Sequence, residues 1–415
     1  MAAQPKILRA TLARVDAVLA AIDAASGIDF PYKDSLDALN IVAAEFRDIR
    51  QTLVDSTNPA IAPAALKGYC ARALDAIFGN LPLVGFLARS ANANGAPELH
   101  GPMRRLTAKA IGKDAKLVIS SEWDFSPFTL LYPHNALSEF VLVGLPMSES
   151  GNALVAPLAG HELGHNIWRH HKVLQRLVPL AQEKLRACIQ GRWADFKKET
   201  ALTDPKQLDD LIGQTFLADP FRRAVAQSEE LFCDLVGLRL FGEGYLYAFE
   251  YLLAPGVSGE RSTDYPRVQD RVNVLQNSAT AWGISSPTAF AESFEPQDMG
   301  SLFLQSFADE TALALVPDLM KCAGELTAPL ALVKHTDQDM EKLAARFRAL
   351  VPATGARHLG WLINAGWRVY FSEVAGPGTS NSPLSKLKDE DRARVLNELL
   401  LKSFEVFEIE ELQSK

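Results

Sequence analysis

Two histidines four residues apart, His161 and His165, lie in the stretch LAGHELGHNIWRHH, residues 158–171. On a helix, side chains at this spacing share one face, one turn apart, so both imidazoles can bind the same ion. Glu162 follows His161 directly, and its carboxylate would lie beside such an ion, where it can take a proton from water. The pattern predicts a catalytic metal site on a helix.

The other notable residues of this stretch are two glycines and two further histidines. Gly160 and Gly164 are poor helix formers, and their missing side chains would let another segment or a substrate approach closely. His170 and His171 follow a turn or more later, where we expect them to be solvated. The alternative explanation is coincidence. An HExxH pattern should arise by chance in roughly one such chain in a hundred.

A third metal ligand is expected from another element, because catalytic zinc usually has three protein ligands and one open position. The best candidate stretch is EELFCDLVG, residues 229–237, in which Glu230 and Asp234 again share a helical face. Asp234 lies among apolar residues and would need a partner when buried, such as the ring N–H of a liganding histidine. A solvated acidic helix start is the alternative, with Glu229 as a second candidate ligand.

HELGH followed by ELFCD resembles the HExxH…ExxxD pattern of the gluzincin zinc metallopeptidases, and most closely their HtpX/CAAX-prenyl-protease branch. The segment STDYPRVQDRVNVL, residues 262–275, is similar to the STHPxxxxRIxxL segment of that branch. The matching residues are Ser262, Thr263, Pro266, Arg271 and Leu275. The chain differs from the branch in having Tyr265 in place of a histidine, and in lacking the membrane spans of its classic members. The resemblance covers roughly residues 115–280.

The resemblance implies that His161, His165 and Glu230 bind one zinc ion per chain. Glu162 would be the general base and Asp234 the partner of a liganding histidine. The chain would then be a soluble zinc metalloendopeptidase, a hydrolase that cleaves a peptide or protein substrate through a zinc-activated water.

The resemblance also implies that Arg271 lies near the site, where it would hold the helices or the substrate, or simply pair with an acid. Tyr265 could donate a hydrogen bond to the oxyanion of the transition state. Tyr245, His358 and Tyr370 are alternatives for that role.

Two other functions are compatible with these residues. The chain could be a non-catalytic scaffold or regulatory protein stabilised by zinc, although a scaffold gains nothing from an acid at Glu162. It could also be a zinc hydrolase that acts on a non-peptide amide or ester.

The surrounding elements predict a mostly helical α+β protein with a zincin-like catalytic core. We expect a helical N-terminal region at residues 1–112, the metallopeptidase core with a small sheet at 113–285, and a helical C-terminal region at 286–415. The flanking helices could cover the cleft and make the enzyme latent. The expected helices are at about 6–25, 35–56, 63–80, 157–199 and 228–242, and the expected strands are at 115–121 and 138–146.

Two details of these elements bear on the site. Ser228 is a plausible N-cap of the helix that carries Glu230, and Gly242 would end it. The strand at 138–146 could lie at the edge of the cleft and pair with an extended peptide, or it could be an interior strand.

Composition limits the possible partners. A net charge of −8 argues against binding to nucleic acid, whose partners are basic. The four cysteines form no CxxC pair, which indicates reduced thiols and a cytoplasmic location. No uninterrupted apolar run approaches the ~18–20 residues of a membrane span, so we expect none. The oligomeric state is not predicted.

Overall fold

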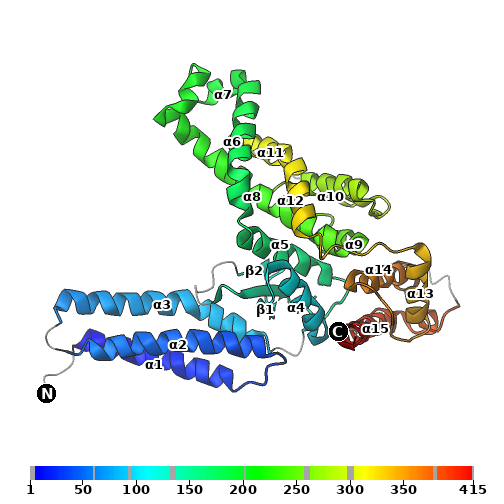
Figure 1. Cartoon of the computed structure of the whole chain (residues 1–415), viewed down its shortest axis with the longest axis horizontal. Helices are drawn as coiled ribbons and strands as arrows, with labels where there is room; N and C mark the ends of the chain where they lie inside the picture. Colours follow the sequence, from blue (N-terminus) through cyan, green and yellow to red (C-terminus); the bar gives the residue numbers. More distant parts are fainter. Residues whose placement is uncertain are drawn as a thin grey trace. The chain divides into compact units, whose positions relative to one another are not determined.

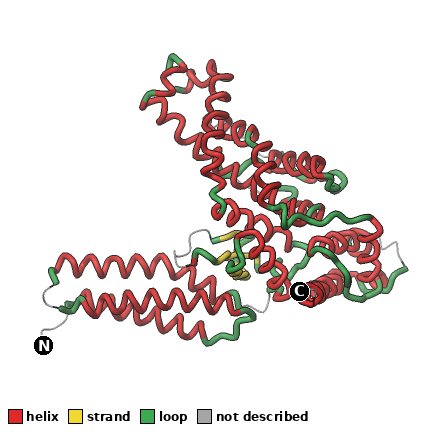
Figure 2. Tube along the Cα trace, in the orientation of Figure 1, coloured by secondary structure: helices red, strands yellow, loops and turns green. Residues whose placement is uncertain are grey.

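The structure is a computed structural model. It describes residues 5–58, 61–91, 95–130, 137–200, 202–256, 262–296, 303–376 and 381–413. Helices account for 71% of it, and the strands form one small three-stranded sheet (Figure 2). The expected class, a mostly helical α+β protein, is therefore confirmed. The chain forms two compact units, made of residues 1–107 with 114–151 and of residues 108–113 with 152–415.

The first unit contains long helices followed by the sheet (Figure 1). The helices are α1 (Lys6–Ser26), α2 (Lys33–Asp55), α3 (Pro63–Arg89) and α4 (Pro97–Ile111), the last of which ends in the second unit. The strands are β1 (Lys116–Glu122), β2 (Phe128–Thr129) and β3 (Phe140–Pro146). The sheet thus groups with the N-terminal helices, whereas the sequence grouped it with the HExxH helix.

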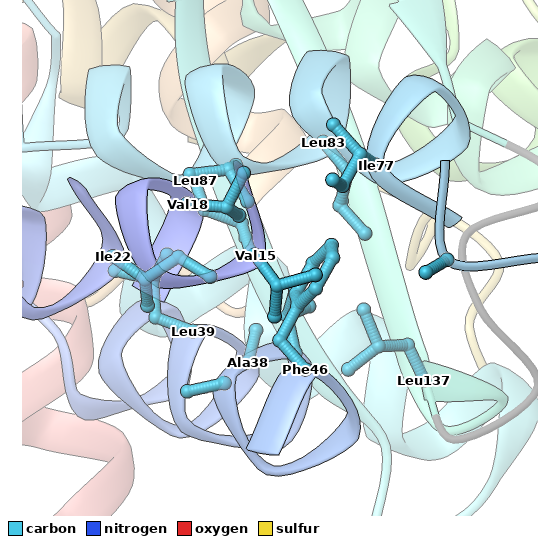
Figure 3. Packing of buried hydrophobic residues seen from close by; sticks show 14 of the residues in the cluster. Val15, Val18, Ile22, Ala38, Leu39, Phe46, Ile77, Leu83, Leu87 and Leu137 are labelled. Atoms are coloured by element: carbon cyan, nitrogen blue, oxygen red, sulfur yellow. The ribbon is translucent and has the colours of Figure 1, made fainter. Parts of the chain in front are cut away.

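An apolar core holds α1, α2 and α3 side by side (Figure 1). Val15 and Ile22 are two helical turns apart on α1 and are fully buried, as the helical period of the sequence requires. In Figure 3, Val15 lies beside Phe46 of α2, and Ile22 lies beside Leu39 of the same helix. Burying each such side chain contributes about 1.5–3 kcal/mol, so this core accounts for much of the stability of the unit.

Strand β3 is the central strand of the sheet, parallel to β1 and antiparallel to β2. All seven of its residues are buried. A Cβ on Gly144 would lie 2.6 Å from the ring of Phe128, so the glycine lets that ring lie flat on the strand. The expectation that this strand forms a cleft edge is therefore wrong, and the interior alternative holds.

Helix α3 is the one helix among the described residues that is long and apolar enough to cross a membrane by length and composition. Of its most apolar stretch, 44% is buried, and it contributes Leu83, Phe86 and Leu87 to the core of the first unit. A core helix passes the same test, so the absence of a membrane span stays a prediction.

The described residues of the second unit form helices joined by loops, with no strand among them. Its longer helices are α5 (Ala159–His170), α6 (Val173–Gly191), α7 (Trp193–Glu199), α8 (Leu211–Phe241), α9 (Glu243–Leu253), α10 (Val268–Trp282), α11 (Phe303–Ala314), α12 (Val316–Leu326), α13 (Asp337–Arg348), α14 (Leu359–Val369) and α15 (Asp389–Gln413). Short helical turns are η2 (Ala156–Leu158), η3 (Pro205–Asp209), η4 (Phe290–Ser293), η5 (Tyr370–Val374) and η6 (Leu384–Lys386).

Two helix predictions in this unit need correction. The helix expected at 157–199 is split into α5, α6 and α7, because Lys172 adopts a left-handed conformation and Arg192 leaves the helical region. Helix α8 begins at Leu211, well before Ser228, whose hydroxyl donates to the carbonyl of Ala224 at 2.7 Å inside the helix. Ser228 is therefore not an N-cap. Gly242, with φ +61°, does end α8.

Candidate metal centre

Helices α5 and α8 cross at two glycines of the HExxH stretch. A Cβ on Gly164 would lie 2.7 Å from the Cα of Cys233, and a Cβ on Gly160 would lie 2.8 Å from the ring of Phe241. Only glycine permits this approach, because such distances are shorter than real Cβ contacts. The glycines thus admit a second helix, as one of the sequence alternatives predicted, and that helix carries the acidic residues.

The two imidazoles face one carboxylate across this crossing. The Nε2 of His161 lies 3.3 Å from Oε2 of Glu230, and the Nε2 of His165 lies 3.6 Å from Oε1. Both separations exceed the usual 2.7–3.2 Å of a hydrogen bond. Two atoms bound tetrahedrally at about 2.0–2.1 Å from one zinc ion lie about 3.3 Å apart, which is close to these values. The three side chains could therefore hold one such ion.

Asp234 holds His161 in place from the other side of the ring. The Nδ1–H of His161 donates to Oδ1 of Asp234 at 2.9 Å, so Nε2 is the ring nitrogen that faces Glu230 and could bind an ion. Arg271 of α10 donates to both oxygens of the same carboxylate at 2.8 Å. Burial alone would raise the pKa of Asp234, which has no solvent exposure, but the charge and hydrogen bonds of Arg271 keep the pKa well below its usual range.

Glu229 plays the equivalent part for His165. The Nδ1–H of His165 donates to Oε1 of Glu229 at 2.9 Å, so this carboxylate faces the ring atom opposite Nε2. Glu229 therefore orients a candidate ligand, and the alternative that it is itself the third ligand does not fit. This role is not among those predicted from the sequence. A signal for it exists, because each of two candidate histidine ligands needs an acceptor at its second nitrogen, and Asp234 can serve only one of them.

The ionisable groups of the site perturb one another strongly. Burial would lower the pKa of His161, but its hydrogen bond to Asp234 and the nearby carboxylate of Glu230 raise it to about 10. Burial would raise the pKa of Glu230, but the closeness of His161 lowers it. Burial raises the pKa of Glu162, which is 4% exposed and is close enough to His161, His165 and Glu230 to respond to their charges. Glu162 thus combines burial with a place beside the candidate ligands.

Cys233 is a second candidate for the third ligand. Three potential ligand atoms, one each from His161, His165 and Cys233, lie within 4.8 Å of one another. Both Nε2 atoms face the carboxylate of Glu230, each opposite a different oxygen, at 3.3 and 3.6 Å. This match at two points favours Glu230 as the third ligand.

No model of a known protein family matches this chain, and comparisons with curated proteins and with solved structures also find no match. The resemblance to gluzincins therefore depends on the quoted motifs and on the geometry of the site.

Tyr265 is half exposed, and the negative charge of Glu230, together with partial burial, raises its pKa to about 12. Its segment is fixed two residues earlier. Gln227 and Gln305 each donate to the carbonyl oxygen of Thr263, at 3.3 and 3.0 Å, and to Oδ1 of Asp309, at 2.9 and 3.0 Å. Helix α11, which carries Gln305 and Asp309, thus positions the segment that brings Tyr265 near Glu230.

The three alternatives to Tyr265 are placed elsewhere or are already engaged. The Tyr245 hydroxyl is buried and donates to Asp234 at 2.7 Å. His358 caps α14, accepting from the N–H of Gly360 at 3.0 Å. The ring of Tyr370 packs edge-on against that of Trp367, 5.4 Å away. Of these residues, Tyr265 is the exposed phenol near Glu230.

The two trailing histidines differ from each other. His170 is exposed, as expected. His171 is partly buried, and its Nε2–H donates to the carbonyl oxygen of Ala110 at 2.9 Å. The expectation of a solvated His171 is therefore wrong, because the end of α4 lies against it.

Proposed function

We propose that this chain is a zinc-dependent metallopeptidase with a zincin-like core, similar to the gluzincins. One zinc ion would be held by His161, His165 and Glu230. The observation that carries the proposal is that both Nε2 atoms face the two oxygens of one carboxylate, while both Nδ1 atoms are held by acids. This arrangement fixes the tautomers that metal binding needs.

Zinc in such a donor set acidifies water and polarises a carbonyl group. The chain's own part in hydrolysis begins with Glu162. One oxygen of its carboxylate takes the proton of the attacking water as the water oxygen bonds to the carbonyl carbon of the substrate. The resulting carboxylic acid then gives that proton to the amine nitrogen as the C–N bond breaks. Burial, which raises the pKa of Glu162, suits it to both steps.

Tyr265 is the candidate donor to the carbonyl oxygen of the substrate. Its phenol is exposed, stays protonated because its pKa is about 12, and is held near Glu230 by the Thr263 contacts. A donor placed where negative charge develops typically contributes 10²–10³-fold to turnover.

The test compares Glu162→Gln with the wild-type chain and with Glu183→Gln, a change at an exposed glutamate of α6. Each protein is assayed for bound zinc and for hydrolysis of casein and of an unstructured peptide library. Glu162→Gln should keep its zinc and lose turnover by roughly 10²–10⁴-fold. Glu183→Gln should match the wild type, and His161→Ala should lose the zinc.

Undiminished hydrolysis by Glu162→Gln would remove Glu162 from its role. Zinc binding with no hydrolysis of any peptide would favour the scaffold function instead. Steady cleavage of casein by the full chain would also argue against latency.

A further inference from the structure

The Tyr245 hydroxyl donates to Oδ1 of Asp234 at 2.7 Å, and Tyr245 has no solvent exposure. The same oxygen accepts from Nδ1 of His161 and from Arg271. We propose that Tyr245 is a positioning residue for His161, acting through Asp234, and that Asn364 of α14 anchors it. This inference rests on the proposed zinc site.

The neutral hydroxyl of Tyr245 orients the Asp234 carboxylate rather than neutralising its charge. Arg271 already neutralises Asp234 and contacts both of its oxygens. A carboxylate that is hydrogen-bonded to one arginine alone can still rotate about that contact. The third donor on Oδ1 sets the angle at which this oxygen meets the His161 ring, and so sets where Nε2 of His161 lies.

The ring of Tyr245 occupies the space that a side chain at Gly237 would fill. Gly237 lies one helical turn after Asp234 on α8, and a Cβ there would be 2.2 Å from Cε2 of Tyr245. No side chain at position 237 is compatible with the observed ring position. Glycine is less favourable than alanine in a helix interior, so its presence at position 237 fits the need to accommodate this ring.

Helix α14 fixes the backbone that carries Tyr245. The N–H of Gly244 donates to Oδ1 of Asn364 at 2.7 Å, and a Cβ on Gly244 would lie 2.5 Å from that oxygen. Asn364 is 1% exposed. Asn364 is therefore connected to His161 by a continuous series of residues. Asn364 binds Gly244, Gly244 precedes Tyr245 in the chain, and Tyr245 binds Asp234, which binds His161. Helix α14 thus helps to position the candidate metal centre.

The experiment measures zinc affinity, by competition with a chelator, for wild type, Tyr245→Phe and Tyr247→Phe. Tyr247 lies on the same helix, and its hydroxyl contacts Glu243 rather than the site. Tyr245→Phe keeps the ring and removes one hydroxyl, so we expect 10–100-fold weaker zinc binding. Tyr247→Phe should stay within about twofold of wild type, and Asn364→Ala should weaken binding in the same direction as Tyr245→Phe.

Thermal unfolding of the zinc-free proteins separates positioning from stability. Wild-type zinc affinity in folded Tyr245→Phe would overturn the inference, even if its unfolding temperature fell. If Tyr245→Phe does not fold, unchanged affinity in Asn364→Ala overturns it instead. Failure of the wild-type chain to bind zinc would overturn the proposed function as well, and it differs from failure of the inference because it needs no variant.

Discussion

Gly164 of α5 faces Cys233 of α8 so closely that a Cβ on Gly164 would lie 2.7 Å from the Cα of Cys233. The contact is between backbones, so no side-chain rotation can relieve a larger residue. The crossing of α5 and α8 brings the histidines of one helix to the acids of the other. Stability and metal binding should therefore depend on this single contact.

Gly164→Ala should destabilise the protein by about 1–3 kcal/mol, because overpacking forces the two backbones apart. Zinc affinity should fall with it. Gly68→Ala is the matched control, since Gly68 is an exposed residue of α3 with nothing within 4 Å of an added Cβ. That change should stabilise the protein by up to about 1 kcal/mol. Urea unfolding measures both, and equal stability of the two variants would contradict the crossing.

Glu229→Ala should weaken zinc binding by 10–100-fold, because Nδ1 of His165 loses its acceptor. Glu229→Gln keeps an acceptor oxygen and should lose much less. Chelator competition distinguishes the two. If Glu229→Gln abolished zinc binding while Glu230→Gln retained it, the assignment of ligand and orienting acid would have to be exchanged.

Arg271→Leu should destabilise the protein by roughly 3–5 kcal/mol, since it leaves the fully buried carboxylate of Asp234 without its cation. Arg50→Leu is the comparison. Arg50 of α2 pairs with Asp16 of α1, and because both side chains are exposed, such a pair contributes about 0–1 kcal/mol. Chemical denaturation of the two variants side by side provides the measurement. If both variants lost a similar free energy of unfolding, the buried Arg271–Asp234 pair would contribute no more to stability than a surface pair.

Acid should weaken the fold through His358. Its Nε2–H donates to the carbonyl oxygen of Leu330, and its Nδ1 accepts from Gly360, so the ring must be neutral. Burial lowers its pKa from 6.5 to about 4. The unfolded chain therefore binds more protons in this range, and stability is lost as the pH falls from about 6.5 to about 4.

The contribution of His358 to that loss is at most about 3 kcal/mol, from the size of the shift. It is isolated as the difference between wild type and His358→Asn, which can still cap α14 but does not titrate. The unfolding free energies should diverge between pH 7 and pH 4, with the variant falling less. Parallel curves would mean that His358 is not the responsible group.

Local patterns in the sequence predicted much of this structure. The helical periods of α1 and α2 and the β-branched runs of β1 and β3 indicated their elements to within a few residues. The spacings of His161 with His165, and of Glu230 with Asp234, indicated the faces that the structure brings together. Each of these is a property of one short segment, which is why it can be read without the fold.

Features that depend on distant contacts were not predicted. The central place of β3 is set by pairing with both β1 and β2, which its own residues do not specify. Helix α8 runs through Pro220 because packing against α5, α6, α11 and α12 outweighs the missing hydrogen bond. The roles of Glu229 and Asn364 required knowing which atoms they face.

The most direct test of the central claim is a metal-edge anomalous map from crystals grown with zinc. The account predicts one ion at about 2.0–2.2 Å from Nε2 of His161, Nε2 of His165 and a carboxylate oxygen of Glu230. An ion that takes the Sγ of Cys233 in place of that oxygen, or no zinc at this position, would contradict it.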